Sequence, residues 1–152
     1  MLIRKLATAC QLPIDHWVIL IKSWFIMLYV RLRMDLTPFR SWKHWLINQP
    51  AEMIKPLNNG EKSRIITYRR MITLASRYHL INANCLPKSL TLKWMLEKDN
   101  IHCELKLGLN LDSKDFHGHA WLQRNEIVLN DNHDVALRYP VKQELNQKPL
   151  SN

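Results

Sequence analysis

The sequence predicts an α+β fold in which helices come first and a small antiparallel sheet follows. Apolar residues recur at intervals of three and four positions as far as Leu96, as they do on the buried faces of helices. From Ile101 onward apolar and polar residues alternate, which is typical of strands. Of the 152 residues 47% are hydrophobic, which is enough for one hydrophobic core. The chain is too short for two full enzymatic domains.

The helical part comes first. Helices are predicted over 1–12, 15–34, 38–46 and 61–78, with a polar loop over 50–60. Asp15 is a suitable N-cap for the helix that follows it, and Thr37 is one for the next helix, with Pro38 in the first helical position. The third helix carries an aromatic stripe that indicates core packing, made of Phe39, Trp42, Trp45 and Leu46.

The second part begins with another helix. It is expected to start at Cys85, after Asn84, and to continue to about Leu96, with Pro87 tolerated in its first turn. Strands are predicted over 101–108, 116–122 and 127–129, and the chain becomes polar again from 140. This order places one helix directly before an antiparallel sheet.

The charge is strongly positive. Lys and Arg number 22 against 13 Asp and Glu, a net charge of +9, which suits an acidic partner, a nucleic acid or an anionic membrane. The outer face of the helix over 61–78 is basic and consists of Lys62, Arg64, Arg69, Arg70 and Arg77. Such a face is usually solvated, and no zinc-finger, helix-turn-helix or aromatic RNA-binding pattern accompanies it. We therefore expect no nucleic-acid partner.

The most apolar stretch runs from Trp17 to Arg31. Lys22 interrupts it, and the run over 23–30 is far shorter than the ~20 residues that cross a bilayer. It also lacks the cleavage site of a signal peptide. We expect a buried or partner-facing helix, although its aromatic residues leave a peripheral membrane contact open. The odd number of cysteines, 3, together with the lack of a secretory signal, predicts reduced thiols and a cytoplasmic protein.

Three residues stand out as candidates for chemistry. Cys85 is at a predicted helix start, where free backbone N–H groups and the positive end of the dipole stabilise an anion such as a thiolate. His119 follows on the second predicted strand, and histidine is the usual acid–base partner of a nucleophilic cysteine. Asp131 comes at the end of the next strand, where a carboxylate can orient the imidazole. A helix Cys, a strand His and a strand Asp occur in this order in papain- and transglutaminase-like enzymes.

Other residues compete for these roles. Cys10 and Cys103 are expected to take no part in the chemistry. Cys10 comes shortly before Pro13, which interrupts the helical pattern, and Cys103 is within a predicted strand. His117 and His119 share a strand face and suggest a metal pair, but no closely spaced cysteine pair accompanies them, so no metal site is expected. His133 and Asp134 are alternatives to Asp131, which fits the strand end better. As oxyanion donors we consider the N–H of Cys85 and the side chains of Asn82 or Asn84.

The residues around these candidates resemble a known family. Asn84-Cys-Leu-Pro-Lys-Ser-Leu, His119-Ala-Trp and Val128-Leu-Asn-Asp131 are similar to motifs of the transglutaminase-like leader peptidases of lasso-peptide biosynthesis. The similarity extends from about residue 82 to residue 131, roughly a third of the chain. It implies Cys85 as nucleophile, His119 as base and Asp131 as the residue that orients it. Gly118 stands where the family pattern leads us to expect a small residue such as Ala.

The resemblance also implies an organisation and a set of partners. We expect a helical region for partner docking over 1–58, a transglutaminase-like cysteine peptidase core over 59–140 and a polar tail over 141–152. The substrate would be a ribosomally made precursor peptide, recognised through a separate small leader-binding protein, and a macrolactam-forming cyclase would act on the product. No cofactor is expected, and a nucleotide requirement is left open. The rival functions are a non-catalytic scaffold, acyl transfer to an amine by the same triad, and a basic nucleic-acid binder.

Overall fold

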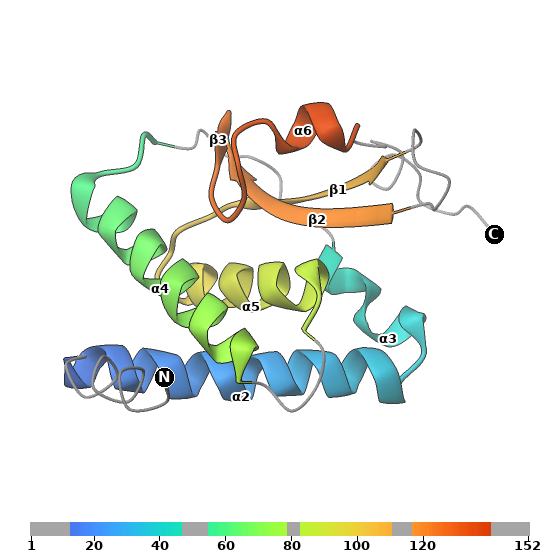
Figure 1. The fold of residues 1–152 in the computed structure, drawn as a ribbon, viewed down its shortest axis with the longest axis horizontal. Coiled ribbons are helices and arrows are strands. Elements are labelled where there is room, and N and C mark those ends of the chain that lie inside the picture. The colour runs from blue at the N-terminus through green and yellow to red at the C-terminus, as the bar shows by residue number, and fades with distance from the viewer. Residues whose placement is uncertain (1–12, 47–54, 79–82, 111–116, 141–152) are drawn as a thin grey trace, which may run out of the picture.

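The computed structural model describes residues 13–46, 55–78, 83–110 and 117–140, and it has the α+β architecture that the sequence predicts. Helices α2 and α4 lie on one side of the central helix α5, and a three-stranded sheet lies on the other (Figure 1). The helix predicted over 1–12, Cys10, Asn82 and the tail over 141–152 are outside the described residues.

Helix α2 spans Ile14–Leu36, two residues further than predicted. Pro13 is its N-cap, so Asp15 lies in the first turn, where its charge suits the helix dipole. The inner face buries Ser23, Met27 and Val30, which follow each other at helical spacing. The Ser23 hydroxyl donates to the carbonyl of Ile19 (2.7 Å), so this buried polar group has a hydrogen-bond partner. No helix within the described ranges is long and apolar enough to cross a membrane.

The prediction of one helix over 38–46, capped by Thr37, is wrong in the cap and in the type of helix. Thr37 does not cap it, because the Thr37 hydroxyl (2.5 Å) and N–H (3.2 Å) both donate to the carbonyl of Arg33 and close α2 instead. Pro38 is the N-cap of a short helix, α3 (Phe39–Trp42), which continues as the 3₁₀ turn η1 (Lys43–Leu46). Trp42 is buried, whereas Phe39 is exposed.

Helix α4 spans Asn59–Arg77 and begins two residues before the predicted start. The reason is a capping box: the Asn58 side chain accepts from the N–H of Glu61, and the Glu61 carboxylate accepts from the N–H of Asn58, both at 2.8 Å. This turns the end of the predicted loop into the first helical turn. The buried face consists of Ile65, Met71, Ile72 and Ala75, whereas the neighbouring Ile66 is exposed.

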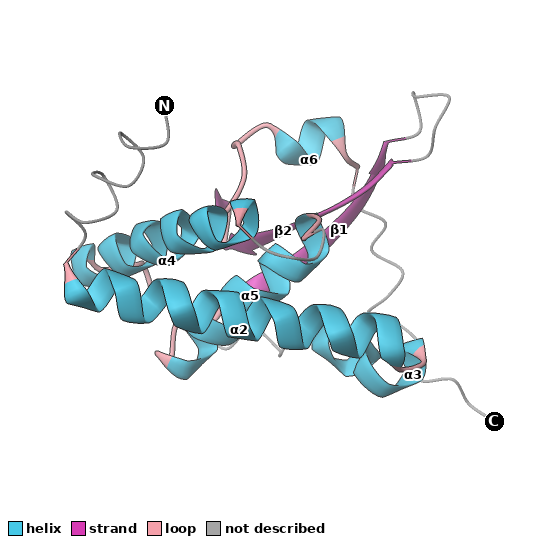
Figure 2. Ribbon diagram, turned by 60° about the horizontal axis from the view of Figure 1, so that its bottom comes forward, coloured by secondary structure: helices cyan, strands magenta, loops and turns pink. Residues whose placement is uncertain are grey.

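Helix α5, Cys85–Lys98, confirms the predicted helix start and is the centre of the fold. It contacts α2 and α4 on one side and β1 and β2 on the other (Figure 2). Its end is tied to α4, because the Tyr68 hydroxyl donates to Asp99 (2.6 Å) and Arg64 lies 3.4 Å from the same carboxylate. Burial, followed by the hydrogen bond and the charge of Asp99, raises the pKa of Tyr68 to about 12.

The sheet has the antiparallel order β1-β2-β3, with β1 Glu104–Asn110, β2 His117–Arg124 and β3 Ile127–Val128. Asn125, in the left-handed region at φ 54°, forms the turn between β2 and β3. A four-residue helix, α6 (Val135–Arg138), follows the sheet and was not predicted. One hydrophobic core includes Met27 and Val30 of α2 together with Leu122 of β2, so it draws residues from both sides of residue 58. The division of the chain at that residue stays a prediction.

Candidate active site

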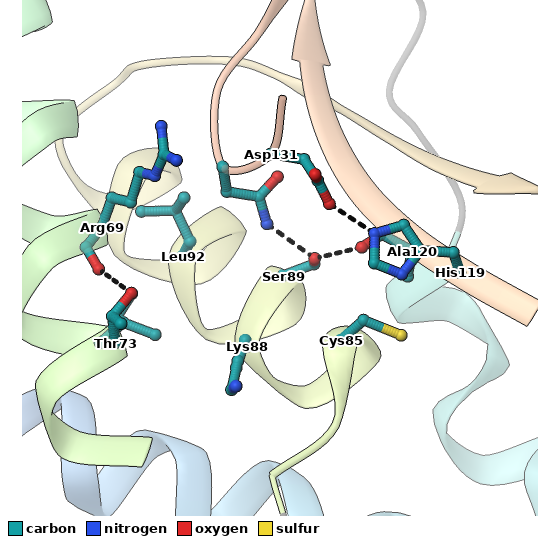
Figure 3. A pocket seen from close by; sticks show the side chains of 11 residues that line it. Arg69, Thr73, Cys85, Lys88, Ser89, Leu92, His119, Ala120 and Asp131 are labelled. Carbon is teal, nitrogen blue, oxygen red and sulfur yellow. Dashed lines mark hydrogen bonds and ion pairs between the residues drawn. The ribbon is translucent and has the colours of Figure 1, made fainter. Parts of the chain in front are cut away.

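A pocket of about 270 Å³ opens where α4, α5, β2 and the segment after β3 meet (Figure 3). Its lining includes all three residues singled out from the sequence, Cys85, His119 and Asp131. The remaining lining residues are Arg69, Ile72, Thr73, Lys88, Ser89, Leu92, Ala120 and Asn130. The fold therefore brings together three side chains that lie between positions 85 and 131 of the sequence.

Cys85 is the first residue of α5 and carries a free thiol. The N–H groups of a first helical turn have no partner within the helix, so the thiol is next to the positive end of the dipole. The preceding residue, Asn84, makes no side-chain capping bond, and its side chain is exposed. Cys85 is partly buried and faces the pocket, a setting that suits a nucleophile.

Cys103 has the opposite surroundings. It is 7% exposed and belongs to the hydrophobic core just before β1. Burial raises the pKa of its thiol to about 12, against a modest opposing effect of the Lys93 charge. This agrees with the expected role of Cys103 as a bystander.

His119 and Asp131 form a hydrogen-bonded pair. His119 Nε2 and Asp131 Oδ2 are 2.5 Å apart, with 23% and 22% of the two side chains exposed. Because Nε2 is engaged by the carboxylate, Nδ1 is the ring nitrogen that remains for a second partner. Figure 3 shows the ring and the Cys85 side chain at the same end of the pocket. Among the described residues no hydrogen bond joins Cys85 to His119, and such contacts commonly tighten only when substrate binds.

The surroundings of Asp131 favour its charged form. Partial burial acts to raise the pKa of this carboxyl, but several interactions outweigh it. They are the hydrogen bond with His119, the N–H of Asn132 donating to Oδ1 (2.7 Å), and the positive charges of His119 and Arg138. The pKa of Asp131 therefore lies below its ordinary value, as a carboxylate that orients an imidazole requires.

The alternatives to Asp131 lie elsewhere. Asp134 is the residue before α6 and pairs with Arg138 at 3.3 Å, while His133 is exposed. Neither lines the pocket. For the pair of His117 and His119, where no metal site is expected, the side chain of His117 is outside the described part, and the described residues contain no group of three His, Cys, Asp or Glu that could hold a metal ion.

The ring of His119 is held from its faces as well. It stacks on Tyr139 at 4.7 Å and 29° and on Trp121 at 6.2 Å and 23° between ring centroids and planes. Tyr139 comes directly after α6, and Gly108 of β1 makes room for it: a Cβ at Gly108 would lie 2.8 Å from Tyr139 Cβ and would overlap the Tyr139 carbonyl. The sequence does not single out Tyr139, because a four-residue helix leaves no periodic signal.

A second set of polar contacts surrounds these residues. The buried Ser89 hydroxyl donates to the carbonyl of Ala120 (3.0 Å) and accepts from Asn130 Nδ2 (2.8 Å). Asn130 Oδ1 accepts from the N–H of Leu122 (2.7 Å). Neither Ser89 nor Asn130 has a role predicted from the sequence, although both belong to the motifs that carry the family resemblance.

Gly118, next to His119, is not tightly enclosed. A Cβ at this position would meet Leu109 Cδ2 at 3.6 Å, an ordinary van der Waals contact. The site therefore accepts either Gly or Ala before the histidine, so the glycine is no obstacle to the resemblance.

Comparison with known proteins gives one match. No significant match was found among curated proteins or among solved structures. The family model described as the transglutaminase-like superfamily matches residues 27–142, which include the C-terminal part of α2, all of α4, the central helix, the whole sheet and α6. Because this match covers well over half of the 152 residues, the chain belongs to the transglutaminase-like superfamily.

Proposed function

We propose that this protein is a cysteine peptidase that removes the leader from a ribosomally made precursor in lasso-peptide biosynthesis. The observation that carries the proposal is the pocket that Cys85 shares with the hydrogen-bonded pair of His119 and Asp131. Membership of the transglutaminase-like superfamily supports thiol chemistry, because such domains are usually Cys-His-Asp enzymes. The motif resemblance around Cys85, His119 and Asp131 supports the choice of substrate.

In the first step, the Cys85 sulfur attacks the carbonyl of the last leader residue. The Cys85 thiol first passes its proton to His119; a carbon–sulfur bond then forms, the carbon–nitrogen bond to the core peptide breaks, and His119 gives that proton to the leaving amine. The product of this step is a thioester between the leader and Cys85. Asp131 stabilises the imidazolium and fixes Nε2, so that Nδ1 faces the reaction.

In the second step, water attacks the thioester. His119 takes a proton from this water, the carbon–sulfur bond breaks, and the leader leaves as a carboxylate. We assign the N–H of Cys85 at the start of α5 as one donor to the oxyanion in both steps. The released core carries a new α-amine, which a macrolactam-forming cyclase would join to a side-chain carboxylate.

The partner we propose is a separate leader-recognition protein that docks on the outer face of α2. This face carries large apolar side chains at helical spacing that remain exposed, among them Ile21 at 52% and Phe25 at 60%. The others are Ile14, Trp17, Val18, Tyr29, Leu32 and Leu36. Figure 2 shows α2 in front, with no other described element covering its outer side. Co-purification with the recognition protein, reduced by Ile21→Lys with Phe25→Lys, tests this assignment.

Leader removal from the cognate precursor, with the recognition protein present, tests the function. Wild type is expected to release leader and core. Cys85→Ala is expected to release neither at a measurable rate, and Cys103→Ala serves as the matched control because that thiol is outside the pocket. If Cys85→Ala cleaves at the wild-type rate, the nucleophile assignment is wrong.

Acyl transfer is the second candidate, because the superfamily match favours it equally. Both reactions pass through the same thioester and differ in whether water or an amine accepts the acyl group. The mass of the leader product distinguishes them. A free carboxylate means hydrolysis, whereas the mass of an added amine means transfer.

A further inference from the structure

We infer that Ser89 and Asn130 are positioning residues that hold the three proposed catalytic residues in a fixed mutual arrangement. This inference rests on the proposed function. It concerns two side chains that take no part in the proposed chemistry, one of them fully buried (0% exposed). Together they connect α5, β2 and the segment after β3, which are the elements that supply Cys85, His119 and Asp131.

Each contact of this network is next to a proposed catalytic residue. Ser89 is one helical turn after Cys85, so it is on the same face of α5. Its hydroxyl donates to Ala120, the residue after His119, at 3.0 Å. It accepts from Asn130, the residue before Asp131, at 2.8 Å (Figure 3). A shift of any one of the three elements therefore breaks a bond that is one residue or one turn away from the chemistry.

The Asn130 side chain also explains how Asp131 reaches His119. The N–H of Leu129 still donates to the Leu122 carbonyl (2.9 Å), in the manner of a strand pair. At the next residue the chain leaves the sheet, and Asn130 Oδ1 takes over as acceptor for the N–H of Leu122 (2.7 Å). The Asn130 side chain thus accepts the hydrogen bond that a backbone carbonyl would accept if β3 continued. The backbone can therefore leave the sheet here and direct Asp131 toward the imidazole of His119.

The chemistry of the two side chains fits this role closely. A serine hydroxyl has one proton to donate and oxygen lone pairs to accept, and both functions are used here. An asparagine amide accepts through Oδ1 and donates through Nδ2, and this structure uses both. Replacing the fully buried Ser89 by Ala would leave the Ala120 carbonyl and the Asn130 amide without this partner.

The test uses the full-length protein and the rate at which iodoacetamide alkylates Cys85, measured by peptide mass spectrometry over a range of pH. His119→Ala provides the reference for a Cys85 without its imidazole. Ser89→Ala and Asn130→Ala are the test variants. Thr91→Val is the matched control, because Thr91 is equally buried on α5 but its hydroxyl donates only to Pro87 of the same helix (2.8 Å).

We expect the rate–pH curve of wild type to differ from that of His119→Ala. Ser89→Ala and Asn130→Ala should move toward the His119→Ala curve while thermal unfolding shows that they remain folded, and Thr91→Val should keep the wild-type curve. In leader removal the two test variants should lose on the order of 10²-fold in kcat, as expected for misplaced reacting groups.

The outcomes separate this inference from the proposed function. If wild type and His119→Ala give the same curve, the proposed pairing of Cys85 and His119 is wrong and the inference falls with it. If those two differ but Ser89→Ala behaves like Thr91→Val, only the inference is overturned. Loss of the folded state in both test variants would also overturn the inference, because the contacts of Ser89 and Asn130 would then be needed for folding and not for positioning the proposed catalytic residues.

Discussion

At the scale of single residues, two cysteines show how surroundings decide reactivity. Cys85 faces a pocket at a helix start, whereas Cys103 is in the core with a pKa of about 12. Iodoacetamide near neutral pH should therefore modify Cys85 faster than Cys103 by about 10²-fold or more, since the thiolate is the reactive form. Peptide mass spectrometry measures both rates. In urea the two rates should converge, and similar rates in the native protein would contradict the structure.

The Asp131 carboxylate offers a second test at this scale. Asp131→Asn keeps the shape but weakens the support of the imidazolium, so it should lower kcat for leader removal less than Cys85→Ala or His119→Ala does. Asp134→Asn is the comparison, because Asp134 lies outside the pocket and shares only its partner Arg138 with Asp131, 3.8 Å from that guanidinium, so its effect on kcat should be the smaller one. If Asp131→Asn were as active as wild type, the proposed role of Asp131 in orienting His119 and stabilising the imidazolium would be wrong.

At the scale of elements, the short helix α6 matters because it brings Tyr139 onto His119. Gly108→Ala should displace this segment, because the new Cβ would overlap the Tyr139 carbonyl and approach Trp121 Cζ3 to 3.0 Å. We expect a loss of about 1–3 kcal/mol in the free energy of unfolding, as for other overpacked sites, together with lower activity. Urea denaturation and the leader-removal assay measure the two effects.

Gly118→Ala is the matched control for this prediction. It adds the same methyl group to the neighbouring strand, where the nearest side-chain atom, Leu109 Cδ2, would be 3.6 Å away. Its stability and activity should stay close to those of wild type. If the two variants behaved alike, close packing of Tyr139 against Gly108 would not be what holds α6 in place.

The elements also show what sequence patterns are able to predict. The helix starting at Cys85 and the strands were predicted because apolar residues at helical spacing as far as Leu96, and the alternating residues that follow, are strong local signals. Helix α6 has four residues and one buried side chain, Val135, so no period is visible. The start of α4 was missed because Asn58 and Glu61 were not considered as a capping box.

The residues of the candidate site also differ in whether the sequence alone indicates a role for them. Cys85, His119 and Asp131 were found because their residue types and order are typical of a reaction class. The contacts of Ser89 join positions 31 and 41 apart in the sequence, and these depend on how α5 packs against the sheet. Serine and asparagine are common in many surroundings, so their residue types alone indicate no role.

At the scale of the whole molecule, the stability should fall at alkaline pH. The pKa of Tyr68 is raised from 10.0 to about 12, so the neutral side chain stabilises the fold fully below pH 10, and this contribution is lost as pH rises through about 12. Cys103, raised from 9.0 to about 12, acts in the same direction from pH 9. Tyr68→Phe should flatten the decline between pH 10 and 12, as measured by urea denaturation. An unchanged pH dependence would contradict the contact with Asp99.

The described part of the chain is organised around α5, with α2 and α4 on one side and the sheet on the other (Figure 1). The pocket opens where α4, α5, β2 and the segment after β3 meet. This arrangement is the reason that a thiol, an imidazole and a carboxylate share one pocket. The central claim is that Cys85 is the nucleophile of an acyl-enzyme reaction.

Trapping the acyl-enzyme intermediate tests whether Cys85 is the nucleophile. The protein is mixed with the cognate precursor and recognition protein, quenched in acid within the first turnover, and its intact mass and peptides are measured. We predict a thioester of leader mass on the peptide that contains Cys85, absent in Cys85→Ala and still present in Cys103→Ala. Leader removal by Cys85→Ala at the wild-type rate, or an adduct on any other residue, would contradict the account.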